Sequence, residues 1–524
     1  MDREAAYRRR WTILGVLVVS LLVVVLDNTI LNVALKTIQI ELGATNSQLI
    51  WAVNSYSLVF ASLLFTWGVL GDRFGRKRVL VVGMLLFGVA SAFSAFAASP
   101  EQLIVYRALM GIGGAAVLPV TLAIITNVFP PDERGKAIGA WAGAVGIAVA
   151  IGPITGGFLL EHFWWGSVFL INVPVVIIGV LGIVVLVPES KGGQRARIDP
   201  VGVVMSVAGL MMLVYGIVHG GDTRQWGSPD VWGFIVGGVA VLALFVWFES
   251  RSDHPSLDVR LFDNREFSTT LAAVTTAFFG LMGATFFLVF YLQLVRGMSP
   301  LQAGTALLPL AFGQFFAATR SSKTAARFGP RVVIGSGLVL VSLVFAAMVL
   351  VDGETPLWQV LTLYLLIGVG MGSAIAPATT VMMSTLPLER AGAGSAVQNT
   401  VRQVGGALGV AITGTVIAVV FGAQLEKAGA GLPPTALAQA SDSLGAAYEV
   451  VQAATAKGLL SPEAAASAIA VANDSFITAM HVATLLTAAA ALLGGLVAYR
   501  FLPNRADAAQ IAAERQRQFT EREN

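Results

Sequence analysis

The run Trp11–Ile40 reads WTILGVLVVSLLVVVLDNTILNVALKTIQI, and it decides what class of protein this is. As a helix it is long enough to cross the roughly 30 Å hydrocarbon core of a bilayer. Its one acid, Asp27, lies near the middle, with no charged neighbour before Lys36. A carboxylate at that depth costs roughly 2.5–3.5 kcal/mol on insertion scales, so Asp27 is by default a candidate for function.

Composition extends this interpretation to the whole chain. Of its 524 residues, 56% are hydrophobic and 12% are charged, whereas soluble domains average about 25% charged residues. The first run is too long for a signal peptide and has no cleavage pattern, so we expect it to be retained. Hydropathy predicts an all-α polytopic membrane protein with fourteen spans, at residues 12–38, 48–70, 79–98, 103–127, 137–160, 166–187, 201–219, 230–250, 267–294, 301–320, 331–351, 358–384, 394–422 and 475–501.

Basic residues predict the orientation of these spans. Lysine and arginine concentrate in the connections that share a side with the amino terminus, such as Arg73–Arg78 and Arg320–Arg331. Because cytoplasmic loops carry an excess of Lys and Arg, we expect both termini in the cytoplasm and the chain in the cell membrane.

An internal repeat predicts two similar halves. DRFGRKRVLVVGMLLFGVASAF, which starts at Asp72, resembles ARFGPRVVIGSGLVLVSLVFAAM, which starts at Ala326. A second pair matches the stretch from Pro119 to Arg134 with that from Pro377 to Arg390. Parallel repeats are a transporter architecture with the substrate site between the halves; chance similarity of Gly-rich apolar segments is the alternative. The predicted division is 1–190 and 267–501 for two six-helix bundles and 191–266 for two linking spans.

Two segments lie outside the predicted spans. Residues 423–474 contain GLPP and a helix-start signal, SPE at Ser461, and predict a short external helical hairpin. A structural cap is a simpler role for it than a binding domain. The polar tail 502–524 predicts a cytoplasmic extension without a deducible role.

Three motifs stand out. Gly68, Asp72, Arg73, Gly75 and Arg76 belong to GVLGDRFGRKRVL, between the second and third spans, where glycines permit a tight turn and the charges can form a latch.

Arg107 lies inside the fourth span, in LIVYRALMGIGGAA. Snorkelling to the interface is the plain alternative to a function there.

The fifth span ends in GIAVAIGPITGG, with Gly152, Pro153, Gly156 and Gly157. Small residues at this spacing form a flat helix face and proline kinks it. We interpret this stretch as a hinge or seal between the two halves; simple helix packing is the alternative.

Together with LDNTILNVAL at Leu26–Leu35, these motifs resemble the major facilitator superfamily, and more narrowly its fourteen-span drug:proton antiporters. The resemblance covers the whole chain. It implies gating by the Asp72 motif, proton transfer by Arg107, an antiporter role for the Gly152 motif, and proton or cation binding by Asp27. The chain departs from the family pattern at Met110, Lys36 and Ala148, and none of these removes a proposed ionisable residue.

Asp27, Asn28 and Asn32 fall within about 140° on a helical wheel, and we expect this polar arc to face a central cavity. Apolar surroundings favour the protonated acid and Arg107 favours the carboxylate. We therefore expect a proton and a cationic drug to compete for Asp27.

Further candidates for the cavity are aromatic or polar, because cation–π contacts suit lipophilic cations. Ordinary packing is at least as good an explanation for each. They are Trp51, Tyr56, Phe286, Phe287, Tyr291, Gln293, Gln314, Tyr364, Gln398, Asn399 and Arg402.

The favoured function is proton-coupled export of hydrophobic, often cationic drugs by a monomer. Export of an endogenous antibiotic, peptide or siderophore, nutrient import and a non-transporting receptor remain alternatives. The chain has no cysteine and only four scattered histidines, and no phosphate-binding G-x-x-x-x-G-K-[ST] loop. We therefore expect no enzymatic activity, no metal, no cofactor and no nucleic-acid partner.

Overall fold

The computed structural model describes residues 7–42, 44, 46–191, 200–223, 226–251, 259–386, 391–429, 432–441 and 443–504, and within these ranges all regular structure is helical. The first part comprises α2 (Arg10–Leu42), α3 (Asn46–Phe74), α4 (Arg76–Ala95), α5 (Pro100–Gly114), α6 (Val117–Val128), α7 (Pro131–His162), α8 (Ser167–Leu170) and α9 (Asn172–Leu186). Next come α10 (Pro200–Thr223), α11 (Pro229–Arg251) and η1 (Val259–Asp263). The last part comprises α12 (Arg265–Phe290), η2 (Tyr291–Val295), α13 (Pro300–Ala306), α14 (Leu308–Phe328), α15 (Pro330–Ala347), η3 (Met348–Leu350), α16 (Leu357–Ser384), α17 (Ala391–Ala428), α18 (Pro434–Ala440), α19 (Leu444–Ala456) and α20 (Pro462–Phe501).

Eleven of the described helical segments are long and apolar enough to cross a membrane, so the chain is a multi-pass membrane protein. Three predicted spans, 137–160, 201–219 and 301–320, fall on α7, on α10 and on α13 with α14, and none of these helices is among the eleven. The predicted fourth span is divided into α5 and α6 by a short turn after its glycines.

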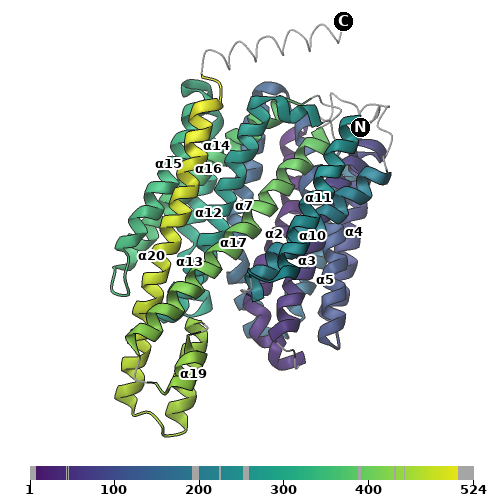
Figure 1. The fold of residues 1–524 in the computed structure, drawn as a ribbon. Helices are drawn as coiled ribbons and strands as arrows, with labels where there is room; N and C mark the ends of the chain where they lie inside the picture. The colour runs from purple at the N-terminus through teal and green to yellow at the C-terminus, as the bar shows by residue number, and fades with distance from the viewer. Residues whose placement is uncertain are drawn as a thin grey trace, which may run out of the picture.

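The helices form two groups, and the linking pair α10 and α11 lies over the first group in the view of Figure 1. One buried core is formed mainly by α2 to α9, and a second mainly by α12 to α17 with α20. The linking helices α10 and α11 pack on each other, and α10 also packs on α3 and α17. We call the end of the molecule where α2 begins and α20 ends the terminal side, and the opposite end, where α19 lies, the hairpin side.

The two groups repeat the same backbone devices. Gly75 and Gly329 precede α4 and α15 with φ of 113° and 88°, values that an L side chain rarely adopts. A Cβ on Gly83 would lie 2.8 Å from the carbonyl oxygen of Gly113, on α5. In the second group a Cβ on Gly337, of α15, would lie 2.7 Å from the carbonyl oxygen of Gly370. Close helix crossings therefore recur where the sequence repeat predicts related structure.

The region predicted as a hairpin is helical and extends two of the predicted spans. α17 continues to Ala428, and α20 begins at Pro462, with α18 and α19 between them. Ser461 caps α20 by accepting a hydrogen bond from the Ala464 amide, so the helix start predicted there is confirmed. The Tyr448 hydroxyl, on α19, donates to the Leu294 carbonyl 2.9 Å away and ties this region to η2.

Candidate functional site

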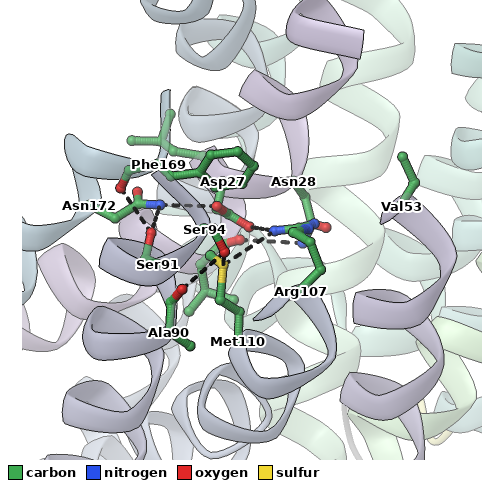
Figure 2. A network of polar contacts seen from close by, with 12 residues as sticks. Asp27, Asn28, Val53, Ala90, Ser91, Ser94, Arg107, Met110, Phe169 and Asn172 are labelled. Atoms are coloured by element: carbon green, nitrogen blue, oxygen red, sulfur yellow. Dashed lines mark hydrogen bonds and ion pairs between the residues drawn. The ribbon is translucent and has the colours of Figure 1, made fainter. Parts of the chain in front are cut away.

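A buried ion pair lies at the centre of the first group. The Asp27 side chain, on α2, and the Arg107 side chain, on α5, are 1% and 0% exposed, and an Arg107 terminal nitrogen donates to Asp27 Oδ2 (Figure 2). Two opposite charges taken out of water are tolerated only when they are paired and hydrogen-bonded. The two side chains are therefore held together as a buried, hydrogen-bonded pair.

The rest of Arg107 is fixed by backbone and aromatic groups. Its Nε donates to the Ala52 carbonyl at 3.2 Å, and its guanidinium carbon lies 4.4 Å from the centroid of the Tyr56 ring, on α3. The Met110 sulfur lies 3.8 Å from the same nitrogen that contacts Asp27. The second terminal nitrogen is buried without a hydrogen-bond partner among the described residues. Arg107 thus has spare donor capacity next to the acid.

The second oxygen of Asp27 is held by a residue that sequence reasoning missed. Asn172, at the start of α9, donates from Nδ2 to Asp27 Oδ1 at 3.0 Å and to Ser91 Oγ at 3.1 Å. Ser91, on α4, in turn donates to the Phe169 carbonyl at 2.8 Å. A buried amide within an otherwise apolar span was the available signal for Asn172. The network joins α2, α4, α5 and α9, all within the first group (Figure 2).

The expected cavity-facing arc is only partly described. Asn28 is half-buried, and its side chain donates to the Val24 carbonyl at 3.3 Å. The Asn32 side chain lies outside the described part. Asp27 itself faces the helices of its own group, because its partners are on α5 and α9.

The glycine motif of α7 does not lie at the contact between the two halves, where it was predicted. A Cβ on Gly152 would collide with Thr29, and one on Gly156 would lie 3.3 Å from Ile30, so this stretch packs on α2 within the same group. Gly157 is half-buried, and the Pro153 side chain lies outside the described part. The predicted contact between the two halves is instead made by other glycines of α7.

Those glycines are Gly135, Gly139 and Gly143, which face α14. A Cβ on Gly135 would lie 2.9 Å from Ser322, and one on Gly143 would lie 2.8 Å from Phe315. A Cβ on Gly139 would collide with the Ala318 carbonyl. Four-residue spacing places all three on one face of α7. The two groups are therefore in close backbone contact along this seam on the terminal side.

The Asp72 motif forms a turn with its own charge network. Arg76 donates to Asp72 from Nε at 2.9 Å and from a terminal nitrogen at 2.7 Å, and both side chains are buried. Gly68 is buried in α3, and Arg73 is exposed at the end of that helix.

Glu189, which sequence reasoning missed, completes this turn. It accepts from the Lys77 amide at 3.1 Å, where a carboxylate complements the positive end of α4. A Cβ on Gly75 would lie 2.6 Å from Glu189 Oε1, a side-chain end that can move aside, so glycine is required there by its positive φ rather than by space.

The remaining candidates do not gather around Asp27, apart from Tyr56. Trp51 stacks on Tyr215, of α10, with ring centroids 5.9 Å apart. The Tyr291 hydroxyl donates to the Asp352 carbonyl at 2.7 Å, and Gln398 donates to Thr379. The others lie in the second group or at its contact with the first: Phe287, Gln314, Tyr364 and Asn399 are buried, Gln293 and Arg402 are half-buried, and the Phe286 side chain is outside the described part.

A family model settles the identity of this architecture. The Major Facilitator Superfamily model matches residues 17–410. This chain belongs to the Major Facilitator Superfamily. It is therefore a membrane transporter and not an enzyme, and the resemblance predicted from the motifs is confirmed.

The relatives of this transporter include exporters. It is 36% identical to the multidrug efflux pump LfrA of Mycolicibacterium smegmatis, covering 94% of this chain and 97% of that protein. It is 35% identical to the methyl viologen resistance protein SmvA of Salmonella typhimurium, covering 84% and 89%. It is 34% identical to the tetracenomycin C resistance and export protein of Streptomyces glaucescens, covering 94% and 91%.

Solved structures share the fold of this transporter. The human organic anion transporter MFSD10 superposes with a TM-score of 0.59 at 14% identity, covering 93% of this chain and 99% of that one. A bacterial homolog of the lysosomal transporter Spinster superposes with a TM-score of 0.55 at 19% identity, covering 93% and 97%.

Proposed function

We propose that this transporter exports hydrophobic drugs from the cytoplasm and is driven by protons that move inward. The observation that carries the proposal is the full-length similarity to a multidrug efflux pump and to resistance proteins. Export of an endogenous antibiotic is the second candidate, because a relative of equal coverage is named for the export of tetracenomycin C.

The membrane arrangement that we propose has fourteen spans in the cell membrane. α7, α10 and α14 complete the eleven apolar segments, α2 to α9 and α12 to α20 form the two bundles, and a single copy carries the function. The terminal side is cytoplasmic, because Arg73, Arg78, Lys136, Lys323 and Arg327 are all exposed there.

The proton acts on the pair of Asp27 and Arg107. In the state described, Arg107 neutralises Asp27, so a cationic drug would have to displace an arginine to reach the carboxylate. Protonation of Asp27 removes that attraction and leaves Arg107 a buried cation with unsatisfied donors, which is costly. The proton therefore releases α5 from α2, and drug and proton exchange through this change in packing rather than by sharing one oxygen.

The antiporter motif supports this role through its position. Gly152 packs on Thr29, two residues beyond Asp27. Any change in the pair is therefore transmitted directly to α7, whose other glycines form the contact with α14. The Asp72–Arg76 pair and Glu189 stabilise the cytoplasmic turn while this movement occurs.

The function is tested in proteoliposomes that contain the purified protein with its cytoplasmic side outward. We expect an imposed pH gradient, acidic inside, to drive uptake of ethidium and methyl viologen. A protonophore should abolish uptake, and ATP should not affect it. Gradient-independent uptake, or none across a panel of dyes and biocides, would contradict the proposal; uptake of a single antibiotic only would favour the second candidate.

Substitution of Gly152 should uncouple transport. In Gly152→Ala the new methyl group collides with Thr29 and moves α7 from α2, and overpacking of this kind costs about 1–3 kcal/mol. We expect gradient-driven ethidium uptake to fall about tenfold or more, since about 1.4 kcal/mol is a factor of ten. Gly15→Ala is the control, because nothing lies within 4 Å of that added Cβ. Wild-type uptake by Gly152→Ala would rule out this role.

A further inference from the structure

Arg402 is a cation inside α17 that the proposed coupling step does not use. Arg107, inside α5, and Arg76, at the start of α4, are both buried, and they are paired with Asp27 and Asp72. Among the described residues no carboxylate forms an ion pair with Arg402 and no acceptor forms a hydrogen bond with it. Its one described interaction is with the Phe278 ring, whose centroid lies 5.0 Å from the guanidinium carbon. A ring face satisfies none of the five N–H donors of a guanidinium.

The position of Arg402 excludes an ordinary surface charge. Arg402 lies about 8 Å beyond Val397, where the apolar segment of α17 begins, and the Phe278 ring that it contacts lies about 20 Å along α12 from Arg265, near the middle of the apolar segment Arg265–Val295. Phe278, on which it lies, is buried, whereas Arg402 is half-buried. A cation at this depth faces the protein interior or a polar cavity rather than lipid tails.

The packing of α12 shows on which side of that helix the Arg402 side chain lies. Thr276 faces the peripheral helix α20, where it abuts Gly494, and Gly280 faces α15 and α20 through Phe345 and Thr487. At 100° per residue, Phe278 lies about 160° from both Thr276 and Gly280 around α12. The guanidinium of Arg402 therefore lies on the side of α12 that faces away from the periphery of the second group.

We propose that Arg402 and Phe278 form a binding site for the carboxylate of an aromatic, amphipathic cargo molecule. A guanidinium presents a planar fork that matches a carboxylate with two parallel hydrogen bonds. The adjacent ring of Phe278 offers an apolar face for the aromatic part of the same molecule. Among the described residues no carboxylate pairs with Arg402, which favours an acidic cargo at this position. The mid-membrane depth excludes a lipid headgroup as the source of the anion.

This inference rests on the proposed export function. It adds aromatic organic acids to the substrates proposed for that function. The test compares 1-naphthaleneacetate with its neutral amide, which differ only at the carboxyl group. Dissociation constants are measured by calorimetry on the purified full-length protein in amphipol. We expect the wild type to prefer the acid, Arg402→Met to weaken acid binding about tenfold or more, and amide binding to stay within about twofold. Arg402→Lys keeps the charge but loses the planar fork of donors. Its affinity for the acid should therefore lie between the affinities of the wild type and of Arg402→Met.

Arg251→Met is the matched control, since Arg251 also lies on an aromatic ring, Trp247 at 4.3 Å, but at the exposed end of α11. It should bind both probes as the wild type does. Phe278→Leu is a second test variant in case Arg402→Met folds poorly. It should weaken the binding of the acid and of the amide to the same extent.

Equal affinity of the wild type for acid and amide, binding of neither probe, or equal loss of both in Arg402→Met would overturn the proposal. Ethidium uptake in the proteoliposomes decides the export function separately. A failure there leaves the comparison of acid and amide binding intact as the test of Arg402.

Discussion

Asp27→Asn should abolish proton-driven export. The substitution keeps the shape of the side chain but leaves Arg107 as an unpaired buried cation, and breaking a buried pair in this way costs about 3–5 kcal/mol. It also removes the only group in the network that can take up a proton. We expect gradient-driven ethidium uptake to fall about 100-fold or more, with a lower thermal unfolding temperature in detergent.

The double variant Asp27→Asn with Arg107→Met separates stability from coupling. Removing both charges should recover most of the lost stability, because replacing a buried ion pair with uncharged groups of similar volume is often neutral. Export should remain lost, since no proton acceptor is restored. Recovery of gradient-driven uptake in the double variant would show that the pair is structural and would refute the proposed role.

Gly139→Leu should hold the transporter open on the terminal side. The new side chain would collide with the Ala318 carbonyl at the seam of α7 and α14, which is backbone and cannot move aside cheaply. Overpacking costs about 1–3 kcal/mol, and about 1.4 kcal/mol is a factor of ten. The population closed on this side, and the export rate with it, should therefore fall about fivefold to 140-fold.

Spin labels can measure that shift because the sequence contains no cysteine. Labels at Lys136→Cys and Lys323→Cys, both exposed, lie on opposite sides of the seam. Gly139→Leu should lengthen the distance between them. Gly233→Leu, in α11, is the matched control, as nothing lies within 4 Å of its added Cβ. An unchanged distance distribution with normal export would exclude a gating role for this seam.

The sequence predicted that Asp27 and Arg107 act together, but it did not predict the other residues that contact them. A lone acid in one apolar run and a lone arginine in another point to each other, because each charge is costly in lipid without a partner. Asn172 and Glu189 were missed, since an amide in a span and an acid in a loop have many other uses. Both are identified only by the atoms they contact, Asp27 Oδ1 and the Lys77 amide.

The glycines of α7 also show that a sequence pattern does not identify the neighbour that a residue contacts. Their spacing predicted a flat helix face, but that face continues along the helix and serves two neighbours. Gly152 and Gly156 pack on α2, whereas Gly135, Gly139 and Gly143 pack on α14. A spacing pattern gives no information about which helix fills the groove.

By itself the sequence determined that this chain is a polytopic membrane transporter, and it placed Asp27, Arg107 and Arg402 within predicted spans. Hydropathy, charge position and repetition are properties of the chain that need no neighbour to define them. Only the tertiary structure decided that Asp27 is neutralised by Arg107, that α7 meets α14 through a different set of glycines, and that Arg402 has no described carboxylate partner. Those outcomes depend on which residues from distant segments come within a few ångströms, and that is set by packing.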